Sequence, residues 1–486
     1  MAKFYDTLLG EYVQNPWIRG LSLDKLSLRD FHYEMMSYDS VTQKKKLNFK
    51  DVELSTAADY SCEDVVITNK LFQAQKSKKV TEIDILNNID LPLIEILKTV
   101  ELDWVKVNRD KLKEIGTLLE NELVILKKEI FNLTEEEFNI NSPKQVWEIL
   151  FEKLALPKWK KTKTWYSVSA DVLWELSHDY PVAQLIIDYR HYSKLLSTYI
   201  DWISDILDSN DFVHTSYNAA VTATGRLSST SPNLQNIPSS HWVAWEIRWA
   251  FISRFEWGTL MAADYSQVEV RLLAIIANDE NLLQAFKDGK DIHHKTAEFL
   301  FPNQVITNSE RKIAKAVNFG VIYWISAFGL SKMINISMKD AKVYIEAFYS
   351  SYPAVKEYFD NTITWCETNW YVETYFGRKR IIAWINDKNA IIKNAAKREA
   401  INMPIQWTSA DIIKLAMIEI QNFIHSENLQ SKMILQVHDE LVFDVYRWEN
   451  KILAENVKKI MESILKNAEI TLKVDIVEWE SWKDTK

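Results

Sequence analysis

The sequence predicts a multidomain protein of the α+β class, and three observations lead to this prediction. The chain has 486 residues, which exceeds a typical single domain and favours roughly two to four folding units with a large core. Apolar residues repeat at helical spacing through residues 86–140, and residues 287–404 are also mostly helical in pattern. Two shorter apolar stretches, near residues 258–266 and 433–445, have instead the character of strands.

The first half of the chain is expected to be predominantly helical after a mixed start. Residues 1–85 have a mixed α/β pattern, in which Asp59–Gln73 is predicted to be a helix. A basic loop, residues 158–165, is expected to precede further helix up to about residue 209. An apolar repeat predicts one long helix, and its members are Leu112, Ile115, Leu119, Leu123, Leu126 and Ile130. This helix is expected to end at the Ser142-Pro143 step.

The second half changes character near residue 218, where small and hydroxyl residues dominate the segment AAVTATGRLSSTSPNLQNIP. The segment GTLMAADYS (258–266) is predicted to be a buried strand, followed by the helix QVEVRLLAIIA. In MILQVHDELVFDV (433–445) the apolar residues alternate, so a strand pair with one apolar face is expected, with Asp439 among its apolar positions.

The composition is that of an ordinary soluble protein, with 47% hydrophobic and 26% charged residues. No apolar run of about 18 residues occurs, and the N-terminus lacks a basic-then-apolar signal pattern, so no membrane partner is expected. Two cysteines, Cys62 and Cys366, favour a reducing, cytosolic setting over a disulfide framework. The net charge of −9 argues against broad basic patches but is compatible with a local basic cleft.

A basic and aromatic stripe marks the segment RKIAKAVNFGVIYWISAFGLS, residues 311–331. If the segment is helical, one slowly turning face carries Arg311, Lys315, Phe319 and Tyr323, because each step of four residues drifts by only ~40°. Two cations followed by two rings suit a ligand with phosphates at one end and a stacking ring at the other. An amphipathic helix with a solvated basic flank would show the same pattern.

Two carboxylates stand where unpaired charge is expensive to bury. Asp264 ends the apolar strand, and Asp439 interrupts the apolar strand pair beside Glu440. Each alone could be a salt-bridged or turn-forming residue. Together they favour a site where strands converge and oxygen ligands bind Mg²⁺, which would activate a hydroxyl and neutralise a phosphate leaving group. No GxxxxGK[ST] motif is present, so a P-loop is excluded.

Five sequence blocks, in order, resemble a known family. ADYSQVEVRLLA, RKIAKAVNFGVIYWISAFGLS and LQVHDELVFD resemble motifs A, B and C of family-A DNA polymerases, those of the bacterial DNA polymerase I type. TATGRLSSTSPNLQNIP and REAINMPIQWTSADIIK are similar to two further blocks of that family. The resemblance implies a Mg²⁺-dependent, template-directed DNA polymerase that acts on primer–template DNA and dNTPs in replication or repair. It also implies a monomer in the bacterial cytoplasm, associated with the nucleoid.

The fold implied by the resemblance is a right hand with an antiparallel-sheet palm and mainly helical thumb and fingers. Its implied parts are a remnant of a 3′–5′ exonuclease-like domain (1–85), the thumb (86–217), the palm (218–286 and 405–486) and the fingers (287–404). Catalysis in such a hand is mainly positioning and charge neutralisation, with closure of the fingers gating incorporation.

Residue roles of the family carry over where the motifs match. Asp264 and Asp439 would hold two Mg²⁺ ions with the backbone carbonyl of Tyr265, and Glu440 would be an auxiliary carboxylate. Lys315 would grip the triphosphate and protonate the leaving pyrophosphate. The other implied dNTP contacts are Arg311 and His293 at the triphosphate, Phe319 stacking on sugar and base and disfavouring dideoxynucleotides, Tyr323 beside the template base, and Glu269 as the gate against a 2′-hydroxyl. The implied DNA contacts, mostly to minor groove and backbone, are Arg226, Asn233, Gln235, Arg398, Gln406 and His438.

The N-terminal region departs from the family pattern. It resembles only the tail of the 3′–5′ exonuclease domain, with Tyr60 and Asp64 matching its last motif, YxxxD. The two earlier motifs, which supply the other metal-binding carboxylates, are missing, as is the 5′ nuclease domain. We therefore expect no proofreading, and interpret the chain as the product of a short gene or as a fragment that begins at an internal Met.

The glycine and tryptophan counts also depart from the family. The chain has 9 Gly and 19 Trp, whereas average usage of ~7% would give roughly 34 Gly. The resemblance implies glycine at nine positions, which are here Trp104, Trp147, Trp159, Trp165, Trp257, Trp324, Trp370, Trp407 and Trp482. At roughly 1–3 kcal/mol each, so many replacements would exceed the usual stability of a protein. We hypothesise that UGA codons read as glycine in the source organism were translated here as Trp; UGG codons at these positions would refute this.

Two other functions stay open at this point. If the Trp residues are real, Trp324 and Trp407 abut the nucleotide pocket and the DNA contact, and a non-catalytic primer–template DNA-binding protein becomes the alternative. The intact carboxylates and cations of motifs A, B and C favour the enzyme instead. A template-independent or RNA-dependent polymerase is disfavoured by Glu269.

Overall fold

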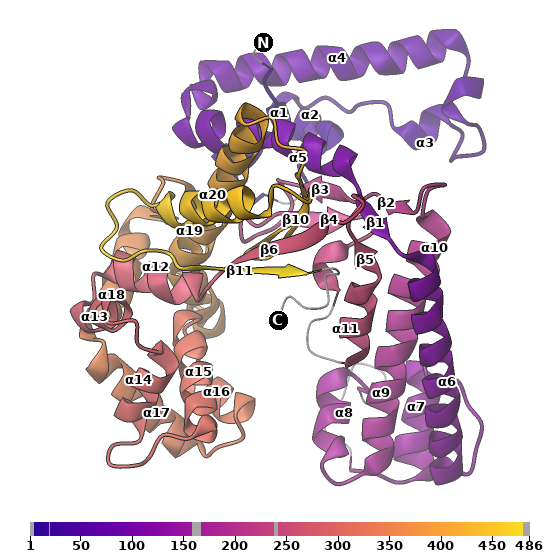
Figure 1. The fold of residues 1–486 in the computed structure, drawn as a ribbon. Coiled ribbons are helices and arrows are strands. Elements are labelled where there is room, and N and C mark those ends of the chain that lie inside the picture. Colours follow the sequence, from indigo (N-terminus) through magenta and orange to yellow (C-terminus); the bar gives the residue numbers. More distant parts are fainter. Residues whose placement is uncertain (1–3, 19, 158–166, 238–241, 480–486) are drawn as a thin grey trace.

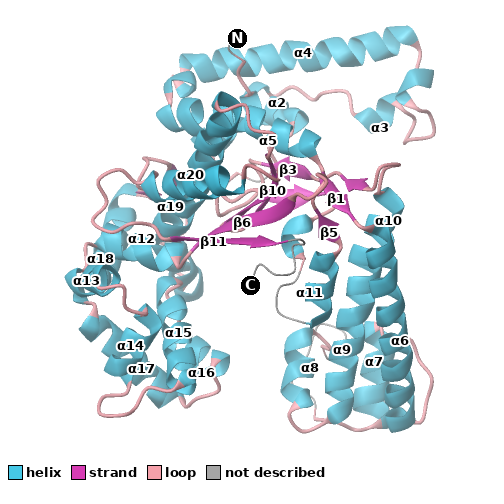
Figure 2. Cartoon of the chain, viewed as in Figure 1, coloured by secondary structure: helices cyan, strands magenta, loops and turns pink. Residues whose placement is uncertain are grey.

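A central antiparallel sheet lies between two helical arms and beneath a layer of N-terminal helices (Figure 1). The computed structural model describes residues 4–479 apart from 19, 158–166 and 238–241. The predicted basic loop and Trp159, Trp165 and Trp482 lie outside the described residues. The mixture of many helices with small antiparallel sheets is the predicted α+β class (Figure 2).

The central sheet has the strand order β11-β6-β10-β9 and is antiparallel throughout. Its strands are β6 (Thr259–Tyr265), β9 (Lys432–Val437), β10 (Glu440–Val445) and β11 (Val474–Trp479). The predicted strand at 258–266 and the predicted strand pair at 433–445 are therefore confirmed.

The expectation of a single apolar face on the strand pair is wrong, because both faces of the hairpin are buried. Phe443 and Val445 pack into a core with α12 (Val268–Ala277) and α19 (Ala390–Ser426). Leu435 and Val442 instead pack into a second core with α6 (Arg109–Thr134). A register shift between Val442 and Phe443 interrupts the regular alternation. Asp439 lies in the turn between the strands rather than within one of them.

The first helical arm, on the right of Figure 1, comprises α6–α10. Its helices are α6 (Arg109–Thr134), α7 (Pro143–Trp147), α8 (Ala170–Ser177), α9 (Pro181–Leu195) and α10 (Trp202–Ile206). The predicted apolar repeat lies on α6, but α6 ends before the Ser142-Pro143 step, where Glu135 adopts a left-handed conformation. Pro143 instead begins α7, a position where its missing N–H has no helical partner to lose.

The second helical arm, on the left of Figure 1, comprises α13–α18. Its helices are α13 (Glu280–Lys287), α14 (Ile292–Leu300), α15 (Asn308–Ile322), α16 (Ala327–Met333), α17 (Met338–Ser351) and α18 (Pro353–Asn369). Residues 311–331 are thus two helices rather than one. The break follows from Trp324, whose φ of +49° cannot continue a right-handed helix, and from Ser326, whose side chain caps α16.

The N-terminal region is helical in its described part, so the expected mixed α/β pattern of residues 1–85 is wrong. Its helices are α1 (Thr7–Gln14), α2 (Leu23–Phe31), α3 (Tyr38–Val41) and α4 (Leu54–Ser77), and α5 (Leu91–Asp103) leads into the sheet region. The predicted helix Asp59–Gln73 is confirmed within α4. The β-branched residues Val65, Val66 and Ile67, which favour strands by propensity, lie in that long helix because Ile67 packs into a core of helices.

The remaining elements connect the arms to the sheet. They are β1 (Val105–Val107), β2 (Phe212–Val213), β3 (Ser216–Asn218), β4 (Ser228–Thr230), α11 (Trp242–Trp249), β5 (Phe251–Ile252), α12 (Val268–Ala277), β7 (Tyr371–Glu373), β8 (Lys379–Ile381), α19 (Ala390–Ser426) and α20 (Asn450–Ser463). None of the described helices combines the length and the apolar character needed to cross a membrane.

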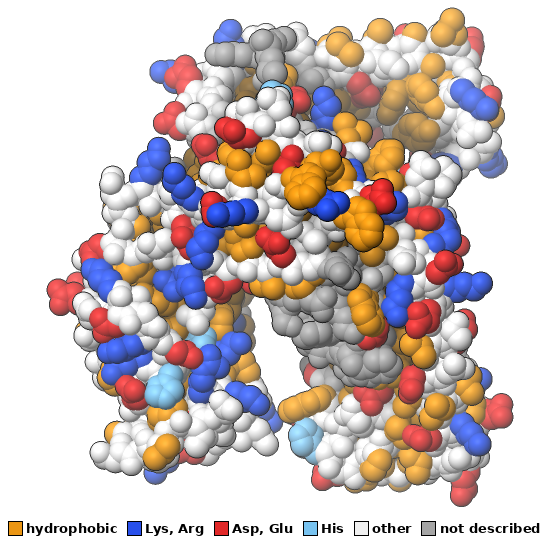
Figure 3. All heavy atoms as spheres, in the orientation of Figure 1, with side chains coloured by type: hydrophobic (Ala, Val, Ile, Leu, Met, Phe, Trp, Pro, Cys, Tyr) orange, Lys and Arg blue, Asp and Glu red, His pale blue; other side chains and the backbone are white. Residues whose placement is uncertain are grey.

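A wide opening separates the two arms in a space-filling view (Figure 3), and the sheet lies above it. The tips of the arms approach each other, since Lys332 of α16 lies 3.6 Å from Glu175 of α8.

Candidate active site

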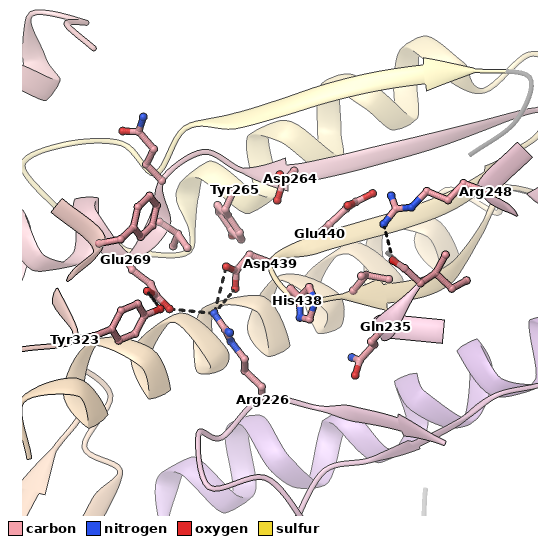
Figure 4. A pocket seen from close by; sticks show the side chains of 15 residues that line it. Arg226, Gln235, Arg248, Asp264, Tyr265, Glu269, Tyr323, His438, Asp439 and Glu440 are labelled. Atoms are coloured by element: carbon pink, nitrogen blue, oxygen red, sulfur yellow. Dashed lines mark hydrogen bonds and ion pairs between the residues drawn. The ribbon is translucent and has the colours of Figure 1, made fainter. Parts of the chain in front are cut away.

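A cavity of about 300 Å³ lies where the β9–β10 turn, the end of β6, α12 and α15 meet (Figure 4). The segments that line it are far apart in the sequence. The predicted site residues among its lining are Arg226, Gln235, Asp264, Tyr265, Glu269, Phe319, Tyr323, His438, Asp439 and Glu440. Four carboxylates face two guanidinium groups in this lining, and this excess of negative charge favours a bound cation.

Sheet pairing brings the two predicted aspartates together. Asp264 lies opposite Glu440 on the neighbouring strand, and the backbone N–H of Tyr265 donates to the Asp439 carbonyl at 3.2 Å. His438 and Asp439 form the turn that joins β9 to β10, and His438 has a φ of +56°. Such sparsely populated backbone conformations of side-chain-bearing residues cluster at functional sites.

The oxygen-only donors of the cavity fit a Mg²⁺ ion. Carboxylates and a backbone carbonyl are hard ligands, and Mg²⁺ is commonly bound by one or two carboxylates together with substrate phosphates. Within the described ranges, no group of three or more His, Cys, Asp or Glu side chains is arranged to hold a metal ion.

A network of hydrogen bonds links the end of α15 to Asp439. Tyr323 Oη donates to Glu269 Oε2 at 2.6 Å, and Arg226 Nη2 donates to Glu269 Oε1 at 3.0 Å and to Asp439 Oδ2 at 3.4 Å. Burial raises the pKa of Glu269, although the Tyr323 hydrogen bond and the Arg226 charge oppose that shift. Burial likewise raises the pKa of Tyr323, and the neighbouring Glu269 charge adds to the effect.

The predicted stripe is confirmed on α15 for its first three members. A capping box of Thr307 and Glu310 starts this helix, and Lys315 Nζ lies 5.9 Å from the centroid of the Phe319 ring. Arg311 Nε donates to Asp291 Oδ2 at 2.6 Å. Tyr323 follows the last residue of α15 and caps it, so it ends the stripe outside the helix.

His293, on α14, joins the same surface. Its ring lies 5.7 Å from that of Phe319, and its Nδ1 is 2.9 Å from Asn318 Nδ2. Burial, together with the positive charges of Arg311 and Lys315, lowers the pKa of His293 to about 4, although Asp291 opposes the shift. Arg311, Lys315 and His293 do not line the cavity itself but lie on the two helices beside Phe319, which does.

The predicted DNA contacts are only partly gathered at the cavity. Gln235 lines it and is held from both ends, accepting from Ser229 N at 3.0 Å and donating to Gln436 Oε1 at 2.8 Å. Gln406 shares a hydrogen bond with Tyr323. Asn233 and Arg398 lie away from the lining; Asn233 accepts from the Ser229 hydroxyl, and Arg398 is exposed on α19.

Three residues at the site were not predicted. Arg248 of α11 and Gln267 line the cavity, and Ser409 Oγ lies 3.5 Å from Asp439 Oδ1. Burial lowers the pKa of Arg248, and the Glu440 charge opposes this. Arg248 had a usable signal in the sequence, because it is a lone arginine in the otherwise mostly apolar run WVAWEIRWAF.

Four of the suspected Trp positions have a backbone that favours glycine. Trp104, Trp257, Trp324 and Trp370 have φ values of +50°, +63°, +49° and +66°. Bulky side chains are rare in this region because Cβ crowds the backbone, whereas glycine enters it freely. Two others, Trp147 and Trp407, lie in helices, and the buried Trp407 ring stacks on Tyr12 with centroids 6.0 Å apart. The codon hypothesis itself stays a prediction.

A sheet that carries paired carboxylates between two helical arms defines the right-hand fold of polymerases. The chain belongs to DNA polymerase family A, whose family model matches residues 109–484. This confirms the resemblance inferred from the five blocks.

Individual relatives agree with this assignment. DNA polymerase I of Lactococcus lactis subsp. lactis is 42% identical over 426 residues, which are 86% of this chain and 48% of the relative. DNA polymerase I of Bacillus subtilis is 39% identical over 493 residues, covering 99% of this chain and 55% of the relative. The chain thus spans about half the length of the curated relatives it matches.

A solved structure covers nearly the whole fold. The POL domain of Pol1 from M. smegmatis, in complex with DNA primer-template and dNTP, superposes with a TM-score of 0.87 and 32% sequence identity. The match covers 98% of this chain and 82% of that one.

Proposed function

We propose that the chain is a DNA-directed DNA polymerase that adds dNTPs to a primer 3′-OH by two-metal-ion nucleotidyl transfer, in replication or repair. The observation that carries this proposal is the cavity of Figure 4, in which Asp264 near the end of β6 and Asp439 in the adjoining β9–β10 turn share a lining with Phe319 and Tyr323. The family, the names of the relatives and the DNA and dNTP held by the M. smegmatis domain support it.

The metal-binding and triphosphate-binding roles would belong to residues of different elements. Asp264, Asp439 and the Tyr265 carbonyl would hold two Mg²⁺ ions, which when bound supply a more acidic primer hydroxyl and charge neutralisation at the leaving pyrophosphate. Arg311 and Lys315, on one face of α15, would grip the triphosphate, with Lys315 as the proton donor to the leaving group.

The remaining residues would contact the base, the sugar and the triphosphate of the incoming nucleotide. Phe319 offers a ring for stacking on the incoming nucleotide. Glu269 is 6% exposed and is fixed by Tyr323 and Arg226, so it would resist displacement by a 2′-hydroxyl. His293 would lie near the triphosphate, and Glu440 would act as an auxiliary carboxylate.

The hand is assigned as a proposal from the arrangement of Figure 1. The first helical arm belongs to the thumb (86–217), the second helical arm to the fingers (287–404), and the central sheet to the palm (218–286 and 405–486). DNA would enter the opening between the arms and contact Arg226, Asn233, Gln235, Arg398, Gln406 and His438. A monomeric state and a cytoplasmic, nucleoid-associated location stay predictions.

Proofreading is not part of the proposal. Tyr60 and Asp64, the predicted remnants of an exonuclease motif, lie on α4, where Tyr60 packs against Phe49 and Tyr38. No metal-binding group of three side chains accompanies them in the part of the chain that the structure describes. A mismatched, 3′-labelled primer incubated with Mg²⁺ and no dNTP should keep its label.

A second candidate is a non-catalytic primer–template DNA-binding protein. The observation that favours it is Trp324, which sits in a strained conformation directly after Tyr323. A chain that binds primer–template but never extends it would support this candidate over the polymerase.

Primer extension with Mg²⁺ and dNTPs tests the proposal directly. D264N and D439N should each reduce extension by about 10³-fold or more, because each removes a negative charge that would hold the Mg²⁺ ions. DNA affinity, measured by fluorescence anisotropy, should stay close to that of the wild type. A substantial residual rate in either variant would refute the metal assignment.

The same assay separates template and sugar preferences. Comparing dNTPs with NTPs on DNA and RNA templates tests whether the chain is a template-independent or RNA-dependent polymerase. We expect incorporation of dNTPs on DNA only, and E269A should admit NTPs because the side chain that occupies the space beside the sugar is shortened.

A further inference from the structure

Arg226 lies between two carboxylates of the cavity, as the dashed lines in Figure 4 show. A single guanidinium nitrogen, Nη2, lies 3.0 Å from Glu269 Oε1, 3.4 Å from Asp439 Oδ2 and 3.5 Å from Asp439 Oδ1. A donor directed at both oxygens of Asp439 uses lone pairs that a metal ion would also need. Arg226 and a metal ion would therefore compete for this carboxylate.

The backbone of Arg226 is anchored, so only its side chain needs to move. Arg226 is the last residue but one of the loop 219–227 between β3 and β4, and the Thr222 hydroxyl donates to the Arg226 carbonyl at 2.5 Å. The preceding Gly225 has a φ of +74°, and a Cβ there would lie only 3.1 Å from the Trp407 ring. The side chain itself is 29% exposed and projects into the cavity.

The contacts of Arg226 would allow its side chain to leave Asp439 and Glu269 for another partner. Its Nε has no hydrogen-bond partner among the residues that the structure describes. Glu269, its other partner, already accepts the 2.6 Å hydrogen bond of Tyr323 and would stay satisfied if Arg226 left. The departure of Arg226 would leave the four carboxylates of the lining opposed by Arg248 alone, and so would strengthen the attraction for a divalent cation.

We propose that Arg226 is the resting counter-ion of Asp439, and that divalent-cation binding is coupled to DNA binding because a primer terminus takes over Arg226. This inference deepens the proposed function and rests on it for the assignment of Asp439 to the metal. Acceptor atoms on the terminal nucleotide would draw the guanidinium away and release both oxygens of Asp439. Because coupling between two ligands is reciprocal, a bound cation would strengthen primer binding by the same factor.

Mn²⁺ binding to the DNA-free protein tests the inference without any catalysis. Mn²⁺ replaces Mg²⁺ as the probe, and the free ion is counted by its electron paramagnetic resonance signal during titration of the full chain. R226Q should bind Mn²⁺ at least about fivefold more tightly than the wild type, which is the lower end of typical coupling factors. R226K keeps the positive charge and should stay close to the wild type.

R248Q is the matched control, because it removes one positive charge from the same cavity at a residue that contacts the Ile237 carbonyl rather than Asp439. Equal tightening in R248Q and R226Q would show a general charge effect and would overturn the inference. The double variant R226Q/D439N should lose the gain of R226Q, because the carboxylate that Arg226 shields is then absent.

A primer–template with a dideoxy-terminated primer provides the second arm. The background is the Mn²⁺ bound when the same DNA is mixed with D264N/D439N, and it is subtracted. After this subtraction, adding DNA should tighten Mn²⁺ binding to the wild type. The Mn²⁺ affinity of R226Q should be nearly the same with and without DNA. R226M, which keeps the aliphatic stem, replaces R226Q if the latter does not fold, as judged by circular dichroism. Unchanged Mn²⁺ affinity in the folded variant, with primer extension by the wild type intact, would overturn this inference and leave the proposed polymerase standing.

Discussion

Trp257 provides the simplest test of the left-handed Trp positions. Its side chain is 74% exposed and its φ is +63°, so it gains little from burial while its backbone is strained. A left-handed conformation costs roughly 1–2 kcal/mol for a residue with a Cβ, and the greater freedom of glycine in the unfolded chain offsets part of that. We expect W257G to raise the free energy of unfolding by about 0.5–1 kcal/mol in urea titrations.

Trp448 is the matched control, because it is 73% exposed and is not among the residues with positive φ. W448G should lower the free energy of unfolding by about 0.5–1 kcal/mol, the usual cost of glycine where φ is negative. The same sign in both variants would contradict the interpretation of Trp257 as a glycine position.

His293 should impose an acid sensitivity on folding. Its pKa is lowered to about 4, chiefly by burial, whereas histidine in an unfolded chain titrates near 6.5. The unfolded chain therefore takes up a proton between pH ~6.5 and ~4 that the folded protein does not, and the free energy of unfolding falls as pH drops through this window. H293N should remove about 2 kcal/mol of that fall, measured by urea titrations from pH 7 to pH 4.

His294 next to it is exposed on the same helix and serves as the control. H294N should keep the pH profile of the wild type. A wild-type profile in H293N as well would show that His293 does not cause the acid sensitivity.

At the scale of a helix, Asp291 joins the start of α14 to Arg311, a proposed nucleotide contact. Its Oδ1 caps α14 by accepting from His293 N at 2.9 Å and His294 N at 3.3 Å, while its Oδ2 accepts from Arg311 at 2.6 Å. Burial would raise the pKa of Asp291, but the Arg311 hydrogen bond and the two backbone donors hold it below its usual range.

We expect D291A to destabilise the protein by about 1 kcal/mol through the lost cap, and to raise KM for dNTP by about threefold or more because Arg311 is no longer held. Asp279 also caps its helix, α13, by accepting from Leu282 N at 3.0 Å, and its second oxygen accepts from Ala354 N at 3.0 Å instead of from an arginine. D279A should cost comparable stability and leave KM unchanged. An unchanged KM in D291A would separate the cap from the nucleotide site.

Another element-scale feature is the break between α15 and α16. Tyr323 directly follows the last residue of α15, and its N–H still donates to the Phe319 carbonyl at 3.3 Å, so its backbone keeps the register of the helix. The chain turns only at Trp324, one residue later, while Tyr323 Oη donates to Glu269 Oε2 of α12. The turn therefore separates the stripe from α16 and does not by itself place the phenol.

At the scale of the whole molecule, a buried charge cluster joins the N-terminal part of the chain to the second half. Arg378 donates to Asp90 at 2.8 Å and to Asp411 at 2.7 Å, and Lys414 lies 3.3 Å from Asp90. All four side chains are at most 1% exposed. Because the two positive and two negative charges are paired, removal of one would leave an uncompensated buried charge.

We expect R378M to lower the free energy of unfolding by about 3–5 kcal/mol, measured by urea titration. The exposed ion pair of Lys451 and Glu455, with side chains 88% and 66% exposed, is the control. K451M should change stability by less than about 0.5 kcal/mol. A small effect of R378M would show that the cluster is not what joins these regions.

Many of the site residues could be predicted from the sequence because the residues next to them in the chain form recognisable strand or helix patterns. Asp264 follows a run of apolar strand residues, and Arg311, Lys315 and Phe319 share the spacing of a helix face. Such patterns depend only on neighbours along the chain, which is why the strands at 258–266 and 433–445 and the helix Asp59–Gln73 were predicted correctly. The ends of the other long helices were not, because α6 ends at Thr134 and residues 311–331 form two helices. The mixed pattern of residues 1–85 was predicted wrongly because local propensity there yields to packing between helices.

By itself the sequence determined the family, the α+β class and the candidate residues, since motif identity and apolar periodicity are written in consecutive residues. Only the tertiary structure decided that the end of β6 with Asp264 meets the β9–β10 turn with Asp439, that Arg226 bridges Glu269 and Asp439, and that four Trp residues occupy left-handed backbone. These features depend on strand register, on the burial of both sheet faces and on backbone torsions. Each of them is a balance of contacts between segments far apart in the chain, which no local pattern encodes.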